Sequence, residues 1–281
     1  MEKNIPKLTE QDLQSYNEKG YWISPKLLDD EQIERLRKAH DRIWSGDYDG
    51  DGFDYYGGWS MPADPLKIRK LDNAWWINDE VRNVVTDPII GEMAAYLMQT
   101  EEVRLWHDQL IYKPGASGAG TKAGNVGWHQ DYGYWQASST TNMVTVWIAL
   151  QDTDLTNGGM MSINGSHKWG LIPDSDTFFD QDMEKLKQRY TSDGREWVEE
   201  PCILKAGHAS FHHSLTFHGS GPNMTDQPRL SVVAHLMPHD TFYRPGVQYH
   251  GNIKLLGPRP YAGQRFDNEY FPVLYSARNK S

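Results

Sequence analysis

RLWHDQLIYKP (residues 104–114) and MVTVWIAL (143–150) are short runs rich in β-branched and aromatic residues, a composition typical of β-strands. Similar runs, separated by Gly-rich or polar turns, follow in EEPCILK (199–205), HASFHH (208–213) and RLSVVAHLM (229–237). The segment before them is mainly helical in pattern, and no internal repeat is visible. Helices first and many short strands afterwards favour an α+β fold whose core is an antiparallel sandwich or jelly roll.

Two amphipathic helices are predicted near the N-terminus. Thr9 is suited to cap a helix over residues 9–20, and Gly20 is suited to end it. Residues 29–45 place apolar side chains at helical spacing and acidic residues in the first turn, which predicts a second helix. The segment YWISP between them reads as a short strand.

A third helix is predicted over residues 78–98, with a break at Pro88, and a helical insertion near residues 179–191 interrupts the strands. The rest of the chain offers no clear boundary between independent units. We therefore expect one domain, composed of an N-terminal helical part (1–100), a jelly-roll core (about 101–240) and a C-terminal extension (241–281).

The composition argues against several classes of function. The net charge is −10, and no dense run of Lys and Arg is present, so nucleic-acid binding is not expected. No stretch approaches the roughly 20 apolar residues of a membrane span, and the N-terminus lacks the apolar region of a signal peptide. The single cysteine, Cys202, excludes an intrachain disulfide. We expect a cytoplasmic protein that acts on a small molecule, and the sequence leaves its oligomeric state open.

Residues 46–64, GDYDGDGFDYYGGWSMPAD, form a long loop rich in Gly, Asp and aromatic residues. Its acidic run resembles a calcium-binding loop, but the twelfth position counted from Asp47 is Gly58, where an EF-hand has Glu. A solvated turn is the favoured interpretation. Aromatic residues in and after this loop are candidates for a lid over a binding site, namely Tyr55, Tyr56, Trp59, Trp75 and Trp76.

The stretch GWHQDYGYW, residues 127–135, contains a potential pair of metal ligands. If it forms a strand, His129 and Asp131 project from the same face, because side chains two residues apart point the same way. They would supply a nitrogen and an anionic oxygen, two-thirds of the 2-His-1-carboxylate triad of non-haem iron enzymes. A His-x-Asp pair alone is weak evidence in a chain with 11 His and 38 acidic residues.

A second motif, FHHSLTFHGSGPNMTDQPRL, strengthens the metal hypothesis. His218 would complete the triad from a later strand, and Arg229, eleven residues on, would point into the same barrel. A guanidinium grips a carboxylate through two hydrogen bonds, and a buried Arg requires an anionic partner. A surface Arg after the turn GPNMTDQP is the alternative interpretation. The other candidates for the third ligand are His208, His212, His213 and His235.

Taken together, three motifs resemble the phytanoyl-CoA dioxygenase family, a branch of the iron(II)- and 2-oxoglutarate-dependent oxygenases. WHQD, WIALQDTDLTNGGMMSINGSHKWG and AGHASFHHSLTFHGSGPNMTDQPR occur in the family's order between about residues 66 and 238. One departure is Gly207-His208, where the family often has Gly-Asp before the distal strand. The resemblance implies a cupin-like double-stranded β-helix with helices packed on one sheet.

The resemblance also assigns roles to individual residues. It implies iron(II) ligation by His129, Asp131 and His218, and binding of the distal carboxylate of 2-oxoglutarate by Arg229 with help from Ser220. Further positions match family residues beside this cosubstrate: Trp147, Gln109 and, in a looser part of the alignment, Lys70. A core position is an equally good interpretation of Trp147.

The implied reaction consumes O2 and 2-oxoglutarate and hydroxylates a small molecule at an unactivated C–H bond, with release of succinate and CO2. Desaturation, epoxidation and cyclisation are possible with the same cofactors. The alternatives are a metal-binding jelly-roll protein without activity and a zinc hydrolase, which would have no use for an Arg clamp. The sequence does not specify the substrate, and no basic cluster suits the phosphates of coenzyme A. The candidate residues of the substrate pocket are Tyr132, Tyr134, Trp135 and Trp59.

Overall fold

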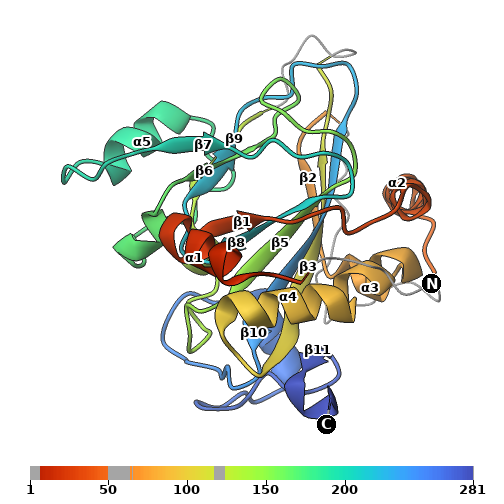
Figure 1. The fold of residues 1–281 in the computed structure, drawn as a ribbon, viewed down its shortest axis with the longest axis vertical. Helices are drawn as coiled ribbons and strands as arrows, with labels where there is room; N and C mark the ends of the chain where they lie inside the picture. Colours follow the sequence, from red (N-terminus) through yellow and green to blue (C-terminus); the bar gives the residue numbers. More distant parts are fainter. Residues whose placement is uncertain (1–6, 50–63, 65, 117–123, 281) are drawn as a thin grey trace.

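The computed structural model describes residues 7–49, 64, 66–116 and 124–280. Its helices lie mainly in the N-terminal third of the chain and its antiparallel sheets in the remainder, which confirms the α+β prediction (Figure 1). The loop predicted over residues 46–64 lies largely outside the described residues, including Tyr55, Tyr56, Trp59 and Gly58. Among the described residues, no helix is long and apolar enough to cross a bilayer.

The first N-terminal helix begins and ends at its predicted caps, and the second occupies its predicted range and has caps of the same kinds. Helix α1 (Glu10–Lys19) starts with a capping box between Thr9 and Asp12, and α2 (Asp30–Ser45) starts with an equivalent box at Asp29. Both end at a glycine in the left-handed conformation, Gly20 (φ 85°) and Gly46 (φ 84°). Such caps pair backbone groups that the helix itself leaves unsatisfied.

The predicted third helix is two helices, α3 (Asp79–Val85) and α4 (Pro88–Met98). Pro88 occupies the first turn of α4, where its missing N–H costs nothing, so the predicted break is confirmed. Helix α5 (Met183–Tyr190) lies within the predicted insertion. Five short 3-10 helices complete the helical elements: η1 (Ala74–Trp76), η2 (Asp131–Gly133), η3 (Ser166–Trp169), η4 (Gly251–Leu256) and η5 (Ala277–Lys280).

The strands form two antiparallel sheets. The larger has the order β1 (Tyr21–Ile23), β8 (Ala209–His213), β5 (Val144–Ala149), β10 (Arg229–Pro238), β3 (Glu102–Lys113) and β11 (Val273–Ser276), with β2 (Arg69–Asp72) also paired to β3. The smaller has the order β4 (Val126–His129), β9 (His218–Ser220), β6 (Met160–Ile163) and β7 (Glu199–Pro201). Strands β1, β2 and β11 come from outside residues 101–240, so the large sheet also draws on the N-terminal part and the C-terminal extension.

The two faces of the large sheet have different chemistry because side chains alternate along each strand. On β5, Val144, Val146 and Ile148 belong to the main hydrophobic core, together with side chains of α2, α3 and α4. Thr145 and Trp147 point to the opposite face and line a cavity. Figure 1 shows α3 and α4 packed against one face of the large sheet. This alternation places polar side chains of five strands, β2, β3, β5, β8 and β10, at the cavity.

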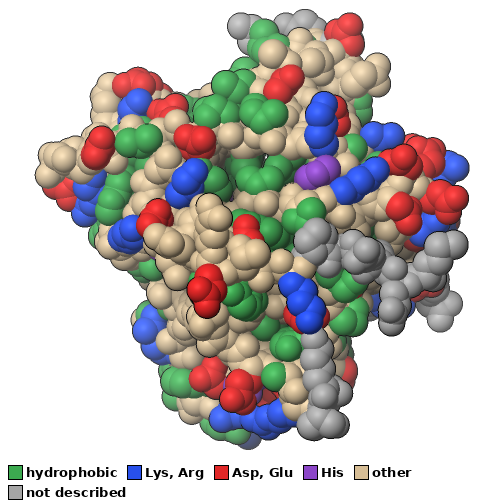
Figure 2. Space-filling model, viewed as in Figure 1, with side chains coloured by type: hydrophobic (Ala, Val, Ile, Leu, Met, Phe, Trp, Pro, Cys, Tyr) green, Lys and Arg blue, Asp and Glu red, His purple; other side chains and the backbone are tan. Residues whose placement is uncertain are grey.

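On the outside of the molecule, charges of both signs are mixed. The face viewed in Figure 2 carries Lys and Arg side chains scattered among Asp and Glu, in keeping with the net charge of −10. Most ion pairs of the described residues are exposed, such as Lys205 with Asp152 (2.6 Å) and Arg189 with Asp174 (2.5 Å). Exposed pairs of this kind add little to stability.

One buried carboxyl works against folding at neutral pH. Asp108 on β3 is fully buried, accepts a hydrogen bond from the Trp75 N–H (3.3 Å) through Oδ1, and has no hydrogen-bond partner for Oδ2 among the described residues. Burial raises the pKa of Asp108 well above its usual range. A carboxyl with a raised pKa in the folded state stabilises the fold fully only below its unfolded pKa, and this contribution is lost as pH rises.

We therefore expect Asp108→Asn to raise the melting temperature at pH 8, and the gain to shrink as pH falls toward 4. The amide keeps the shape of the protonated acid but removes the cost of charging or protonating it. Asp152→Asn is the control, because Lys205 lowers the pKa of this exposed carboxyl and its loss should be neutral or mildly destabilising. Thermal unfolding followed from pH 4 to 8 tests the pair. A gain for Asp108→Asn that does not vary with pH would contradict the explanation.

Candidate active site

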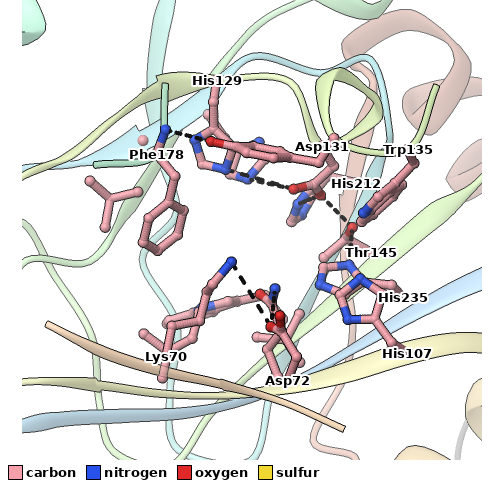
Figure 3. Close-up of a pocket in the computed structure, with 18 of the residues that line it drawn as sticks. Lys70, Asp72, His107, His129, Asp131, Trp135, Thr145, Phe178, His212 and His235 are labelled. Carbon is pink, nitrogen blue, oxygen red and sulfur yellow. Dashed lines mark hydrogen bonds and ion pairs between the residues drawn. The ribbon is translucent and has the colours of Figure 1, made fainter. Parts of the chain in front are cut away.

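A cavity of about 250 Å³ lies between the two sheets and contains most of the predicted site residues (Figure 3). Its walls come from β2, β3, β5, β8 and β10 of the large sheet, from β4, β6 and β9 of the small sheet, and from residues 248–251. The three predicted metal ligands lie on one side of it. The cavity is therefore the place where the two halves of the sequence motif meet.

His129, Asp131 and His218 are buried, and their ligand atoms all lie within 4.8 Å of one another. Asp131 Oδ1 is 3.6 Å from His129 Nε2 and 3.7 Å from His218 Nε2. His129 and His218 are register partners on the paired strands β4 and β9. Two imidazole nitrogens and one carboxylate oxygen on one side of a cavity form the donor set of a 2-His-1-carboxylate iron site.

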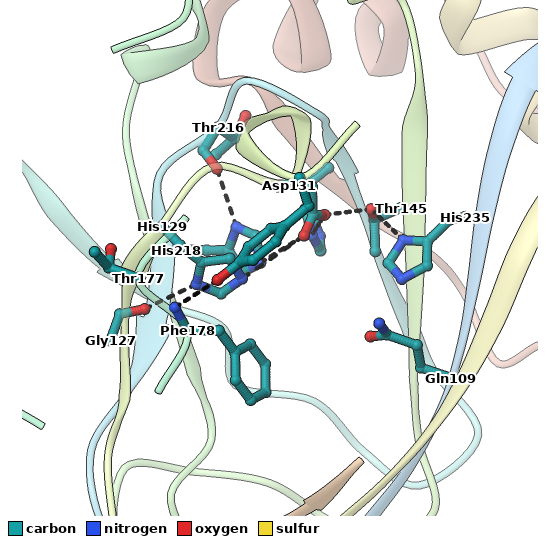
Figure 4. A network of polar contacts seen from close by, with 12 residues as sticks. Gln109, Gly127, His129, Asp131, Thr145, Thr177, Phe178, Thr216, His218 and His235 are labelled. Carbon is teal, nitrogen blue, oxygen red and sulfur yellow. Dashed lines mark hydrogen bonds and ion pairs between the residues drawn. The ribbon is translucent and has the colours of Figure 1, made fainter. Parts of the chain in front are cut away.

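Hydrogen bonds behind the two histidines fix which nitrogen faces the cavity. His129 Nδ1 donates to the Gly127 carbonyl (2.8 Å), and His218 Nδ1 donates to the Thr216 carbonyl (3.0 Å), as Figure 4 shows. Each ring therefore carries its proton on Nδ1 and presents the lone pair of Nε2 to its neighbours. This is the usual support of metal-binding histidines, which need a neutral ring in a set orientation.

The second oxygen of Asp131 is also held. Thr145 Oγ1 donates to Asp131 Oδ2 (2.5 Å) and also lies 2.9 Å from His235 Nδ1. His212 Nε2 approaches the same oxygen to 3.4 Å. Burial opposes the charge of Asp131, but the surrounding histidines, His218 foremost, hold the pKa of this carboxyl well below its usual range. Asp131 is thus an ionised carboxylate with one oxygen left for a cation.

The structure brings the predicted ligands His129 and Asp131 together, but by a different geometry from the one predicted. Strand β4 ends at His129, and Asp131 is the first residue of η2, so the two do not share the face of one strand. The 3-10 turn, in which the Tyr134 N–H bonds to the Asp131 carbonyl, bends the chain back. The carboxylate reaches His129 across this turn.

Arg229 is buried near the opposite end of the same strand face that carries His235. Its Nη1 reaches Ser231 Oγ at 3.4 Å, its Nε has no hydrogen-bond partner among the described residues, and its guanidinium lies 5.1 Å from the Trp147 ring centroid. Burial lowers the pKa of Arg229 to about 10. A buried cation with an unsatisfied donor needs an anion, as the sequence predicted.

Lys113, which the sequence analysis missed, is a second buried basic residue beside Arg229. It pairs with Arg229 across β3 and β10, is fully buried, and donates to Ser220 Oγ (2.7 Å) and the Gly221 carbonyl (2.5 Å). Burial, followed by the charge of Arg229, keeps the pKa of Lys113 well below its usual range. Lys113 does not line the cavity; it positions Ser220, which does, so Arg229 supplies the positive charge at this end of the cavity.

Gly158 leaves room for this lysine. Its φ of 72° favours glycine, and a Cβ there would lie 2.8 Å from Lys113 Cδ and 3.0 Å from the Gly221 carbonyl oxygen. Any other residue would therefore push against both the lysine and its acceptor. The glycine of the NGGMM turn thus positions a side chain of a distant strand.

The remaining predicted cosubstrate residues also line the cavity. Trp147 is buried beside Arg229, and Gln109 donates from Nε2 to Asp72 Oδ1 (2.9 Å). Lys70 points into the cavity, 3.9 Å from Asp72 and 5.0 Å from the Phe178 ring centroid (Figure 3). The pairing of β2 with β3 brings Lys70 and Asp72 to this wall.

The four candidate substrate residues are not all placed together. Tyr134 and Trp135 line the cavity, and the Tyr134 hydroxyl accepts a hydrogen bond from the Phe178 N–H (2.9 Å). Tyr132 is buried in a separate hydrophobic cluster and donates to the Ser138 carbonyl (2.9 Å), so it does not line the cavity. Trp59 lies outside the described residues.

Two further predicted positions differ from their place in the structure. Trp75 belongs to the main core and Trp76 packs against two core clusters, so neither lines the cavity as a lid would. The 3-10 helix η1, which carries both residues, directs their rings into the hydrophobic core. Of the adjacent histidines, His212 lines the cavity and His213 does not, as expected for neighbours on a strand.

Several cavity residues carried no recognisable local signal. Thr145, His235 and His107 lie in one row across β5, β10 and β3, where Thr145 pairs with His235 and His235 pairs with His107. Their common face depends on strand register, which the sequence does not reveal. Counting every second residue back from Lys113 along β3 would have connected it with Gln109 and His107.

Known proteins with similar sequences are oxygenases. The sequence is 23% identical to mouse peroxisomal phytanoyl-CoA dioxygenase over 239 residues, covering 81% of this chain and 68% of that protein. It is 27% identical to ectoine dioxygenase of Streptomyces avermitilis over 249 residues, covering 80% of this chain and 77% of that protein. Both alignments extend well beyond the metal motifs.

Solved structures share the fold. The non-haem α-ketoglutarate-dependent carbocyclase SnoK from nogalamycin biosynthesis has a TM-score of 0.72 at 24% identity, covering 95% of this chain and 96% of its own. EctD from S. alaskensis, solved with 2-oxoglutarate and 5-hydroxyectoine, has a TM-score of 0.67 at 19% identity, covering 92% and 83%. These matches confirm the predicted jelly-roll, or double-stranded β-helix, core.

The sequence model of the phytanoyl-CoA dioxygenase (PhyH) family matches residues 16–231, more than half of the chain. The match includes both metal motifs and Arg229, and it confirms the resemblance drawn from them. It also confirms the expected class of enzyme, an oxygenase that uses iron and 2-oxoglutarate. The chain belongs to the phytanoyl-CoA dioxygenase family.

Proposed function

We propose that this oxygenase hydroxylates an unactivated C–H bond of a small molecule, with iron(II) bound by His129, Asp131 and His218 and 2-oxoglutarate bound toward Arg229. The observation that carries the proposal is the opposite charge of the two ends of one cavity. The buried carboxylate of Asp131 and two imidazoles lie at one end, and the buried guanidinium of Arg229 lies at the other. A divalent metal and a dicarboxylate would satisfy both.

The protein's part at the metal is to hold three donors in a fixed geometry. The Nδ1 hydrogen bonds of His129 and His218 orient their rings, and Thr145 occupies one oxygen of Asp131 so that the other faces the histidines. When bound, iron would supply the oxidising chemistry, using dioxygen with 2-oxoglutarate as the reductant. The chain's residues exclude water and position the two organic molecules.

At the other end, the proposed role of Arg229 is to bind the distal carboxylate of 2-oxoglutarate. Ser220 Oγ accepts from Lys113, which leaves its own hydroxyl proton for the same carboxylate. Trp147 covers the guanidinium, and Gln109 and Lys70 complete the wall toward Asp72. A zinc hydrolase would need no such buried cation, and a non-catalytic metal protein would need no anion site.

For the substrate, the proposal assigns Tyr134 and Trp135 to the wall nearest the metal ligands. The Trp135 ring lies 4.6 Å from that of His235, and the Tyr134 ring lies 6.2 Å from that of His129. Trp59 stays a prediction. The size of the cavity suits a small molecule beside the cosubstrate.

Arg229→Gln should weaken 2-oxoglutarate binding about 10- to 100-fold, because it removes a charged hydrogen-bond donor to a carboxylate. The measurement is an anaerobic titration of the Fe(II)-loaded protein with 2-oxoglutarate, followed by the visible charge-transfer absorption. Arg189→Gln, on exposed helix α5, is the matched control and should bind like the wild type. Equal affinity for Arg229→Gln and wild type would refute the carboxylate assignment, and no absorption in the folded wild type would refute the function.

Thr145→Val should lower metal affinity about 10- to 100-fold, because support behind a ligand typically has an effect of this size. Valine keeps the shape but leaves Asp131 Oδ2 without its hydroxyl donor. Mn(II) binding, measured by electron paramagnetic resonance without 2-oxoglutarate, reports this effect independently of turnover. Thr191→Val, at the end of α5, is the control. An unchanged Mn(II) affinity in Thr145→Val would show that the hydroxyl does not support the ligand.

A further inference from the structure

A wall of histidines borders the cavity beyond the metal ligands. The ring centroids of His107 and His235 are 4.4 Å apart, those of His107 and His250 are 5.0 Å apart, and Trp135 packs against His235. His235 follows Arg229 by six residues on the same face of β10, a distance of about 20 Å along the strand. The wall is therefore separate from the anion site and lies where a substrate would approach the metal ligands (Figure 3).

The hydrogen bonds of His235 determine what its free nitrogen can do. The single proton of Thr145 Oγ1 goes to the carboxylate of Asp131, which can only accept. The contact between Thr145 Oγ1 and His235 Nδ1 (2.9 Å) must then use a proton on the ring. With Nδ1 protonated, the Nε2 of the neutral ring carries a lone pair. It is buried and has no partner among the described residues.

His107 leads to the same result through a different contact. Its Nδ1 lies 3.3 Å from the Asp108 carbonyl oxygen, an acceptor, so this nitrogen is the protonated one. Its Nε2 is then a second lone pair, again buried without a partner among the described residues. Because the two rings are neighbours, donors on adjacent atoms of one ligand can reach both acceptors.

The surroundings of the two histidines extend this acceptor character. Asp72 lines the same cavity as a carboxylate, and its Oδ1 accepts from Gln109. Burial works against its charge, but Lys70 and the nearby histidines lower its pKa overall. His250 is the exception, since its Nδ1 accepts from the Asn252 N–H (3.2 Å) and its Nε2 carries the proton. His250 Nε2 is thus a hydrogen-bond donor, whereas His107 Nε2, His235 Nε2 and the Asp72 carboxylate are acceptors.

We infer that the substrate carries at least two hydrogen-bond donors, O–H or N–H groups on neighbouring atoms, which bind His107 Nε2 and His235 Nε2 beside the carbon that is oxidised. The inference rests on the proposed function and narrows its substrate to the vicinal diol or amino alcohol type. Plain hydrocarbon against this wall would leave two buried acceptors unpaired, and each would weaken binding about 10-fold or more. A site built for hydrogen bonds therefore rejects an analogue that lacks the donors.

The test uses the anaerobic Fe(II)- and 2-oxoglutarate-loaded protein and small cyclic probes. Titration calorimetry compares cis-cyclohexane-1,2-diol with cis-1,2-dimethoxycyclohexane, which has the same oxygens and no donors. We expect the diol to bind at least about 10-fold more tightly. cis-2-Aminocyclohexanol distinguishes the two donor types, because tighter binding than the diol identifies an ammonium read by Asp72 and weaker binding identifies hydroxyls.

Variants of His107 assign the effect to this wall. His107→Phe should weaken diol binding about 3- to 10-fold, and His107→Gln, whose amide oxygen can replace Nε2 as an acceptor, should restore most of the loss. His208→Phe, outside the cavity lining, is the control. Anaerobic 2-oxoglutarate titration should give the wild-type affinity in all three variants.

Several outcomes would overturn the inference. They are equal binding of the diether and the diol, unchanged diol affinity in His107→Phe, or binding of neither the diol nor the amino alcohol by a protein that binds 2-oxoglutarate normally. Each of these leaves the proposed function intact. Failure of the wild-type protein to bind 2-oxoglutarate would instead contradict the proposed function itself, so the two failures are distinguishable.

Discussion

The buried carboxylate of Asp131 is the constraint on which the site depends. A charge in a protein interior is costly unless it is paired and hydrogen-bonded. Asp131 receives one hydrogen bond from Thr145 and is otherwise surrounded by imidazoles, two of which donate from Nδ1 to backbone carbonyls. Its described neighbours satisfy one oxygen and leave the other short of positive charge, which a metal ion would supply.

The folding pattern that brings these groups together is the alternation of side chains on the large sheet. One face of β5 and β10 is apolar and packs against helices, while the other presents Thr145, Trp147, Arg229 and His235. Because neighbouring strands are in register, a polar residue on one strand meets a polar residue on the next. A shift of one residue in β10 would turn Arg229 and His235 toward the helices, so the hydrophobic core also specifies the site.

Local sequence was sufficient for the features that depend on local physics. The caps at Thr9 and Gly20 and the break at Pro88 were predicted because each depends on backbone groups within a few residues. Strands β2, β6 and β11 were not predicted, since each has only four residues and is formed by pairing with distant segments. A periodic pattern of apolar residues cannot be recognised over so few residues.

The residues of the site also differ in whether the sequence alone could predict their place. His129, Asp131, His218 and Arg229 could be identified because several motifs occur in a family's order. The role of Lys113 depends on its register with Arg229, and the place of Tyr132 depends on a 3-10 turn that sends it into the core and its neighbour Tyr134 toward the cavity. The turn also explains why the carboxylate reaches His129 although strand β4 ends at that residue.

These features imply that different parts of one cavity bind different ligands. Asp131 leaves uncompensated negative charge at one end of the cavity, and Arg229 leaves uncompensated positive charge at the other. A metal ion and a dicarboxylate would neutralise these charges, so electrostatics governs the binding of both ligands. The wall of His107 and His235 carries no net charge when its rings are neutral, and burial lowers the pKa of His107 to about 4. With the charged ligands in place, hydrogen bonds at this wall are what remains to distinguish one organic molecule from another.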